Sequence, residues 1–206
     1  MKTQWGYSIA GDDLPNMLSV SDFSLITAGK YSSDGRIQPC IDAASDGIRN
    51  YCGWHVYPQC ECSFSERLLS ENGRIKRAGP DILVQLPAMF VSEISAVIID
   101  GESFDDFALE ANSILRLFDV SCRITRKTVI SVEYTAGIPD SMAGGIRELV
   151  SGRVSRALSS TNGVSSETAG GVSISYNSSW VNSGGAGAMQ TADADILEPF
   201  RLREVF

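Results

Sequence analysis

The sequence changes from a strand pattern to a helix pattern at residues 128–139, which read TVISVEYTAGIP. Apolar and polar side chains alternate from Ile130 to Tyr134, and this predicts a β-strand with one buried face. Pro139 ends the alternation, and Asp140 or Ser141 can cap the helix that we expect next. Apolar residues then recur at helical spacing in one stripe, which consists of Met142, Ile146, Leu149, Val150, Val154 and Leu158.

The strand pattern extends back along the chain to Gln59. Asn72-Gly73 predicts a hairpin turn, because this pair accepts positive φ angles. Further strands are expected near residues 60–64, 82–87, 95–100 and 114–118. Several short strands separated by turn residues are typical of a small β-sandwich or barrel.

Two helices are expected before this β region. The clearer one has an apolar stripe made of Ile37, Ile41, Ala44, Ile48 and Tyr51, and Gly53 suits its end. A shorter helix follows Ser19 or Ser21, either of which can cap it. We expect Phe23, Leu25 and Ile26 of this helix to face inward.

Both ends of the chain have the composition of arms. Residues 1–17 lack a regular period, because Gly6, Gly11 and Pro15 interrupt them. Residues 160–190 are rich in Ser, Gly, Asn and Ala, which is linker composition. The final residues are again densely apolar, and a partner surface would explain such a terminus.

Composition excludes some function classes. The formal net charge is −8, with 17 Lys and Arg against 25 Asp and Glu. Nucleic-acid binding proteins neutralise phosphates with Lys and Arg, so tight DNA or RNA binding is not expected as the main function. No apolar run approaches the roughly 20 residues of a membrane span, and the first residues show no signal peptide. We therefore expect no membrane association, synthesis in a reducing cytoplasm, and five cysteines without disulfides.

His55 is the one histidine, and it lies in the sequence Gly53-Trp54-His55-Val56-Tyr57-Pro58. We interpret Trp54, His55, Tyr57 and Pro58 as a structural corner after a helix end. A catalytic triad on His55 would need a nucleophile and a carboxylate brought to it by folding. We therefore expect no catalytic residues and no enzymatic activity.

Cys52, His55, Cys60 and Cys62 are the sharpest metal candidates, since thiolate and imidazole are zinc ligands. Their spacing lacks the usual C-x2-C pair, so we expect neither a metal nor a cofactor. The acidic residues at 100–110 are interpreted as a solvated loop between strands. Phosphate binding is not expected, because no phosphate-binding loop with its Lys is present.

Two segments of the chain carry a resemblance to a known family. The first includes Ile41-Asp42-Ala43-Ala44 and continues from Ile48 through the corner to Pro58. The second includes Leu86-Pro87, then Val97 to Glu102, and then Val132-Glu133-Tyr134-Thr135-Ala136-Gly137-Ile138-Pro139 before a helix. Together they resemble the head–tail connector proteins of tailed bacteriophages, also called head-completion or head-to-tail adaptor proteins.

The resemblance implies an α+β fold, a small helical bundle with an inserted antiparallel β domain and extended N- and C-terminal arms. The expected parts are an N-terminal arm (1–17), a helical core (18–58 and 138–161), an inserted β domain (59–137), and a flexible C-terminal arm with a hydrophobic tail (162–206).

The resemblance also implies a structural virion protein made in the host cytoplasm and located in the neck. It would form a ring, dodecameric in most of the family, under the portal protein. The ring would extend the channel for passing double-stranded DNA, without sequence-specific binding, and present a platform for a downstream neck or tail-completion protein. The C-terminal segment of such proteins typically reaches the portal, which implies partner-binding roles for Trp180, Ile196, Leu197, Phe200, Leu202 and Phe206.

Two other functions are compatible with the residues. One is a non-catalytic carbohydrate- or surface-binding β module, which the aromatic residues of the β region allow. The other is a small hydrolase that uses His55 with a Cys or Ser. A glycan-binding screen and activity-based probes would distinguish them from the adaptor.

Overall fold

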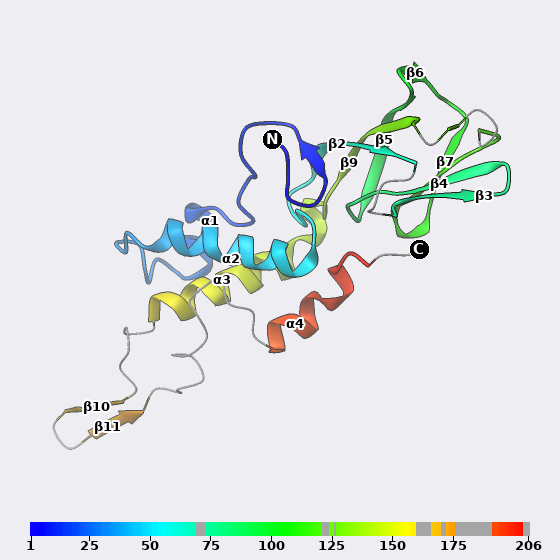
Figure 1. Cartoon of the computed structure of the whole chain (residues 1–206). Helices are drawn as coiled ribbons and strands as arrows, with labels where there is room; N and C mark the ends of the chain where they lie inside the picture. The colour runs from blue at the N-terminus through cyan, green and yellow to red at the C-terminus, as the bar shows by residue number, and fades with distance from the viewer. Residues whose placement is uncertain are drawn as a thin grey trace. The chain divides into compact units, whose positions relative to one another are not determined.

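The chain forms two compact units in a computed structural model, which describes residues 1–68, 73–120, 124, 125, 127–159, 166–169, 172–175 and 191–203 (Figure 1). The first unit joins Met1–Pro15, Gly53–Asp140 and Phe200–Phe206. The second joins Asn16–Cys52 and Ser141–Pro199.

The expected fold class, a helical bundle with an inserted β domain and extended arms, is wrong. Within the described residues the chain is mostly β, with antiparallel sheets of five and four strands and four α-helices. The strands that the sequence pattern missed are short: β1 (Tyr7–Ile9), β6 (Glu102–Ser103) and β7 (Phe107–Glu110). Strand β3 (Ile75–Ala78) follows the expected Asn72-Gly73 turn and pairs with β4. Two to four residues are too few to establish an alternating pattern, so pairing with a neighbouring strand decides whether they form strands.

The five-stranded sheet has the order β1-β2-β9-β5-β6. Its central strands are β2 (Cys60–Arg67), β9 (Val129–Ala136) and β5 (Val91–Ile99). Cys62 lies opposite Tyr134 and Phe64 opposite Val132, and all four side chains are buried. The alternation seen in the sequence therefore places one face of this sheet in the core.

The four-stranded sheet has the order β3-β4-β8-β7. Its central strands are β4 (Asp81–Gln85) and β8 (Ile114–Leu117), and the short 3-10 helix η1 (Ala111–Ser113) joins β7 to β8. Ile82 lies opposite Leu117 and Val84 opposite Leu115, and all four are fully buried. These residues are the apolar core of the second sheet.

The second unit contains α1 (Val20–Ile26), α2 (Ile37–Cys52), α3 (Gly144–Ser159) and α4 (Thr191–Leu197). It also contains an antiparallel hairpin of β10 (Ser166–Ala169) and β11 (Val172–Ser175). Helices α2 and α3 pack against each other and bury Ile41, Ile48, Val150 and Val154. Two 3-10 turns complete the described elements, η2 (Asp140–Met142) and η3 (Glu198–Phe200).

Helix α1 differs from its expected orientation. Ser19 caps it by accepting a hydrogen bond from the Asp22 backbone, and Phe23 is fully buried. Leu25 and Ile26, which were expected to face inward, are 79% and 52% exposed. Two positions along an α-helix correspond to a rotation of about 200°, so Leu25 points away from the side on which Phe23 is buried. Ile26, three positions after Phe23, lies nearer that side but is the last residue of the helix, and it is the less exposed of the two.

None of the described helices is both long and apolar enough to cross a membrane.

Candidate functional site

The corner residues Trp54, His55 and Tyr57 are buried, and Pro58 is half-buried. The Nε2 atom of His55 lies 2.9 Å from the Ala136 carbonyl oxygen, and its Nδ1 lies 2.8 Å from the Tyr7 hydroxyl. A carbonyl can only accept, so Nε2 carries a proton and donates it there. The Tyr7 hydroxyl accepts from the His55 backbone N–H at 3.0 Å and can donate its own proton to Nδ1. A neutral His55 therefore satisfies every one of these hydrogen bonds.

This corner packs against the segment that ends β9. The Ile138 N–H donates to the Val56 carbonyl at 2.8 Å, and the Tyr57 hydroxyl donates to Asp140 at 2.6 Å. Gly137 has a φ of +128°, and a Cβ at this position would lie 2.6 Å from the Pro58 carbonyl oxygen. Only glycine allows such an approach without displacing the backbone.

The structure does not assemble the four zinc candidates into a site. Both ring nitrogens of His55 already have hydrogen-bond partners, and the Cys60 and Cys62 thiols donate to the Pro58 and Cys60 carbonyls at 3.4 Å. Burial, with a smaller effect of Cys60, raises the pKa of Cys62 to about 12. In the described part of the chain, no three His, Cys, Asp or Glu residues are placed to hold a metal ion.

Helix α4 lies on α2 and α3 through buried charges. Arg156 contacts both oxygens of Asp193 at 3.0 and 3.2 Å, and Arg153 Nε lies 3.9 Å from the same carboxylate. Arg153 and Asp193 are only 2% and 3% exposed. Burial lowers the pKa of the Arg153 guanidinium, and Asp193 opposes this effect. The Tyr51 hydroxyl lies near two further acceptors, at 3.0 Å from Glu198 and 3.4 Å from the Ala194 carbonyl.

The predicted partner-binding residues have different environments. Leu197 is fully buried and Ile196 is 53% exposed. Phe200 and Leu202 are half-buried in the first unit, where the Trp54 indole donates to the Phe200 carbonyl at 2.7 Å. Trp180 and Phe206 lie outside the described residues. Of the four described residues, Ile196 is the most accessible to a partner.

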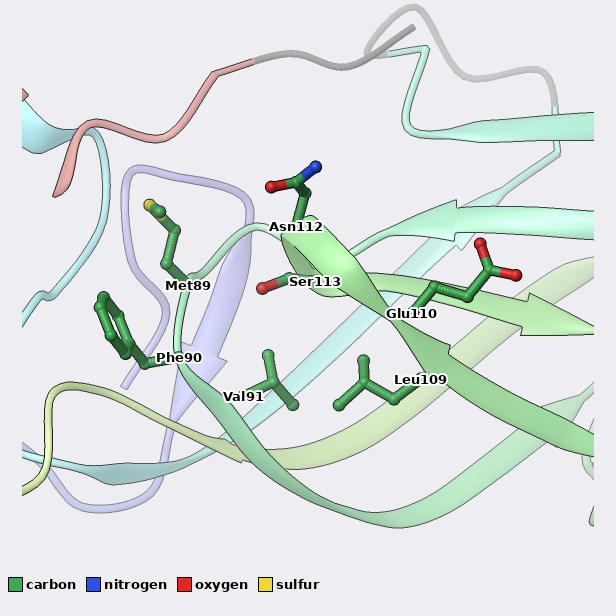
Figure 2. A pocket seen from close by; sticks show the side chains of 7 residues that line it. All are labelled: Met89, Phe90, Val91, Leu109, Glu110, Asn112 and Ser113. Carbon is green, nitrogen blue, oxygen red and sulfur yellow. The ribbon is translucent and has the colours of Figure 1, made fainter. Parts of the chain in front are cut away.

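Phe90 borders a small, mainly apolar pocket. Its ring lies 6.3 Å from that of Trp54 and 6.1 Å from that of Phe200. The pocket has a volume of about 260 Å³. Figure 2 shows Val91 and Leu109 extending toward one another from β5 and β7. The lining residues are Met89, Phe90, Val91, Leu109, Glu110, Asn112 and Ser113.

Three residues that line this pocket have left-handed backbone conformations. Phe90, Asn112 and Ser113 have φ angles of 53°, 60° and 58°. Such a conformation is common for asparagine but unfavourable for a bulky aromatic residue. The surrounding structure must therefore hold Phe90 in place, and this fixes the position of its ring at the pocket rim.

The solvent-facing side of the five-stranded sheet is acidic. Glu61 and Glu93 both lie opposite Thr135, from either side of β9, and Glu133 lies opposite Ser63. All three glutamates are exposed, and none forms an ion pair with a described residue. A shallow hollow of about 420 Å³ crosses this side beside Glu61 and Glu133.

Neither the contact of Asp193 with its two arginines nor the pocket beside Phe90 was expected from the sequence. Asp193, Arg153 and Arg156 are ordinary surface residue types, and folding alone brings the carboxylate to the two arginines. Phe90 follows Met89 in a loop without a regular pattern. The charged residues of α3 give no signal for a buried ion pair, because the carboxylate that pairs with them comes from a distant part of the sequence.

No protein-family model matches the chain, and no curated protein matches it either.

Proposed function

We propose that this protein is a head-to-tail adaptor of a tailed bacteriophage. It is a structural virion protein that forms a dodecameric ring under the portal, extends the DNA channel, and presents a docking platform to neck or tail-completion proteins. It acts without cofactor or catalysis, and its place is the head–tail junction of the virion.

The observation that carries the proposal is the packing of the corner on the end of β9. The resemblance to connector proteins depends on Trp54–Pro58 and on Tyr134–Pro139, two segments far apart in the sequence. Ile138 donates a hydrogen bond to Val56, and Gly137 lies close to Pro58. Both motifs are therefore parts of one packed junction. The proposal depends on this junction and not on the helical-bundle architecture.

The charge distribution agrees with a channel that DNA passes through. The chain has a net charge of −8, and Glu61, Glu93 and Glu133, on the solvent-facing side of the sheet, form no ion pair with a described residue. Carboxylates repel DNA phosphates, so such a surface does not hold the duplex.

The test is electron microscopy of a lysate in which the gene is blocked, in the phage that encodes this chain. We expect full or leaking heads beside free tails, and joined virions when purified protein is added back. The matched control is the same infection with the gene active. Normal joined virions in the blocked lysate would reject the adaptor, and a glycan-binding screen would then test the surface-binding alternative.

A further inference from the structure

Helix α4 and the surface on which it packs are complementary. The helix contributes the Asp193 carboxylate. The surface of α2 and α3, which we call the seat, presents Arg153, Arg156 and the Tyr51 hydroxyl. The described contacts between them are mainly polar, and Leu197 is the fully buried apolar side chain of the helix.

Because these contacts are mainly polar, the seat determines where α4 binds but adds little to the net free energy of binding. A helix of seven residues is too short to persist alone in water, so α4 needs a seat to remain helical. A buried ion pair contributes little net stability but strongly disfavours any arrangement that leaves one charge unpaired. Asp193 therefore fixes where α4 binds and leaves it exchangeable between equivalent seats.

The connection before α4 is long enough to reach a second seat. Six residues (160–165) precede the β10–β11 hairpin and fifteen (176–190) follow it. Extended, those residues span at most roughly 70 Å. A helix such as α2 or α3, with 16 residues, is only about 24 Å long. The chain can therefore place α4 on its own α2 and α3 or on those of a neighbouring copy.

We propose that neighbouring copies of this protein exchange α4, so that the helix of one copy occupies the Arg153 and Arg156 seat of the next. Each chain then has one donor and one acceptor surface, which is the heterologous contact that closes into a ring. The residues after α4, which contact Trp54 and Gln85 through the Phe200 and Arg203 carbonyls, move with it. This inference rests on the proposed function, because it describes how the ring subunits bind each other.

Complementation between two full-length variants tests the exchange. Asp193→Lys removes the carboxylate from the helix but leaves the seat intact. Arg156→Glu alters the seat, at a side chain that is 34% exposed and so tolerant of change, but leaves the helix intact. Neither chain can form the native contact within itself, whereas a mixture can form it between chains.

We expect each variant alone to sediment as a monomer, with its C-terminal segment cleaved at least ten times faster by protease than in the wild type. The equimolar mixture should sediment as a larger species. With one variant isotope-labelled, mass spectrometry should show that the protected tail belongs to the Arg156→Glu chain. Asp195→Lys is the matched control, because it makes the same charge change at an exposed position of α4 and should behave like the wild type.

A mixture that sediments as two monomers with both tails cleaved would overturn the exchange. So would single variants whose tails stay as protected as in the wild type, because Asp193 would then not hold the helix. Either result leaves the adaptor role standing if the blocked-gene lysate contains unjoined heads and tails. Normal virions in that lysate would reject the adaptor role, whatever the mixture does.

Discussion

Gly137 shows how one residue fixes the junction between the corner and β9. Its φ of +128° is essentially restricted to glycine, and a Cβ would lie within 3 Å of three backbone atoms of Pro58 and Gln59. The corner and the strand end can approach each other only because this side chain is absent.

We therefore predict that Gly137→Ala lowers the free energy of unfolding by about 3 kcal/mol or more, measured by urea denaturation. Gly144→Ala is the control, because that glycine is helical and a Cβ added there would have no neighbouring side chain within 4 Å. It should be neutral or stabilise by up to about 1 kcal/mol. Equal stability of the two variants would contradict the tight junction.

Cys62 makes the free energy of unfolding depend on pH in the alkaline range. Its pKa is about 12 in the folded chain, against an ordinary value of 9.0. Between these values the unfolded chain releases the thiol proton and the folded chain keeps it, so the free energy of unfolding should fall as pH rises from about 9 toward 12. Below pH 9 the thiol is protonated in both states and contributes no pH dependence.

Urea denaturation of the wild type and of Cys62→Ala over this pH range measures the effect. The variant should lose stability less steeply, because it keeps the raised pKa of Tyr134 but lacks the thiol. Parallel pH profiles for the two proteins would show that the Cys62 thiol does not titrate differently on folding.

At the scale of elements, substitutions in α1 can show which side of this short helix is buried. Phe23 is fully buried and its ring lies 5.9 Å from that of Tyr31, whereas Leu25 is 79% exposed. Phe23→Ala should lower the free energy of unfolding by about 3–5 kcal/mol. Leu25→Ala should change it by less than about 0.5 kcal/mol.

Thermal denaturation of the two α1 variants is the measurement. Comparable losses would mean that Leu25 also faces the core, as its sequence position alone had indicated. A large loss for Phe23→Ala alone would leave Leu25 and Ile26 as an exposed apolar surface of the second unit.

At the scale of the whole molecule, the charge pattern predicts how the protein behaves toward DNA. The wild type should show no measurable affinity for a double-stranded DNA fragment at physiological salt, by fluorescence anisotropy. Replacing Glu61, Glu93 and Glu133 together with Lys should create binding that weakens steeply with salt, because cations on one side of a sheet can contact several phosphates.

The control for the DNA experiment replaces Asp12, Asp13 and Asp105, which are exposed residues outside this acidic set, with Lys. It makes the same change in net charge and should bind more weakly than the glutamate variant. Salt-sensitive DNA binding by the wild type would contradict a channel surface that repels the duplex.

The amino-acid sequence by itself determined the longer elements and the residues of the corner. Helix α2 and strands β2, β4, β5, β8 and β9 were expected close to where they form, because each is long enough for its apolar residues to show a period. The charge balance and the linker composition before α4 likewise depend only on which residues are present.

Only the tertiary structure decided the fold class, the short strands and the seat of Asp193. Strands β1, β6 and β7 exist because neighbouring strands supply hydrogen-bond partners, and no local pattern encodes that pairing. Asp193 contacts Arg153 and Arg156, which precede it by 40 and 37 residues, so only folding brings these side chains together. Local periodicity reports which side of an element is apolar, but contacts between distant residues depend on how the whole chain packs.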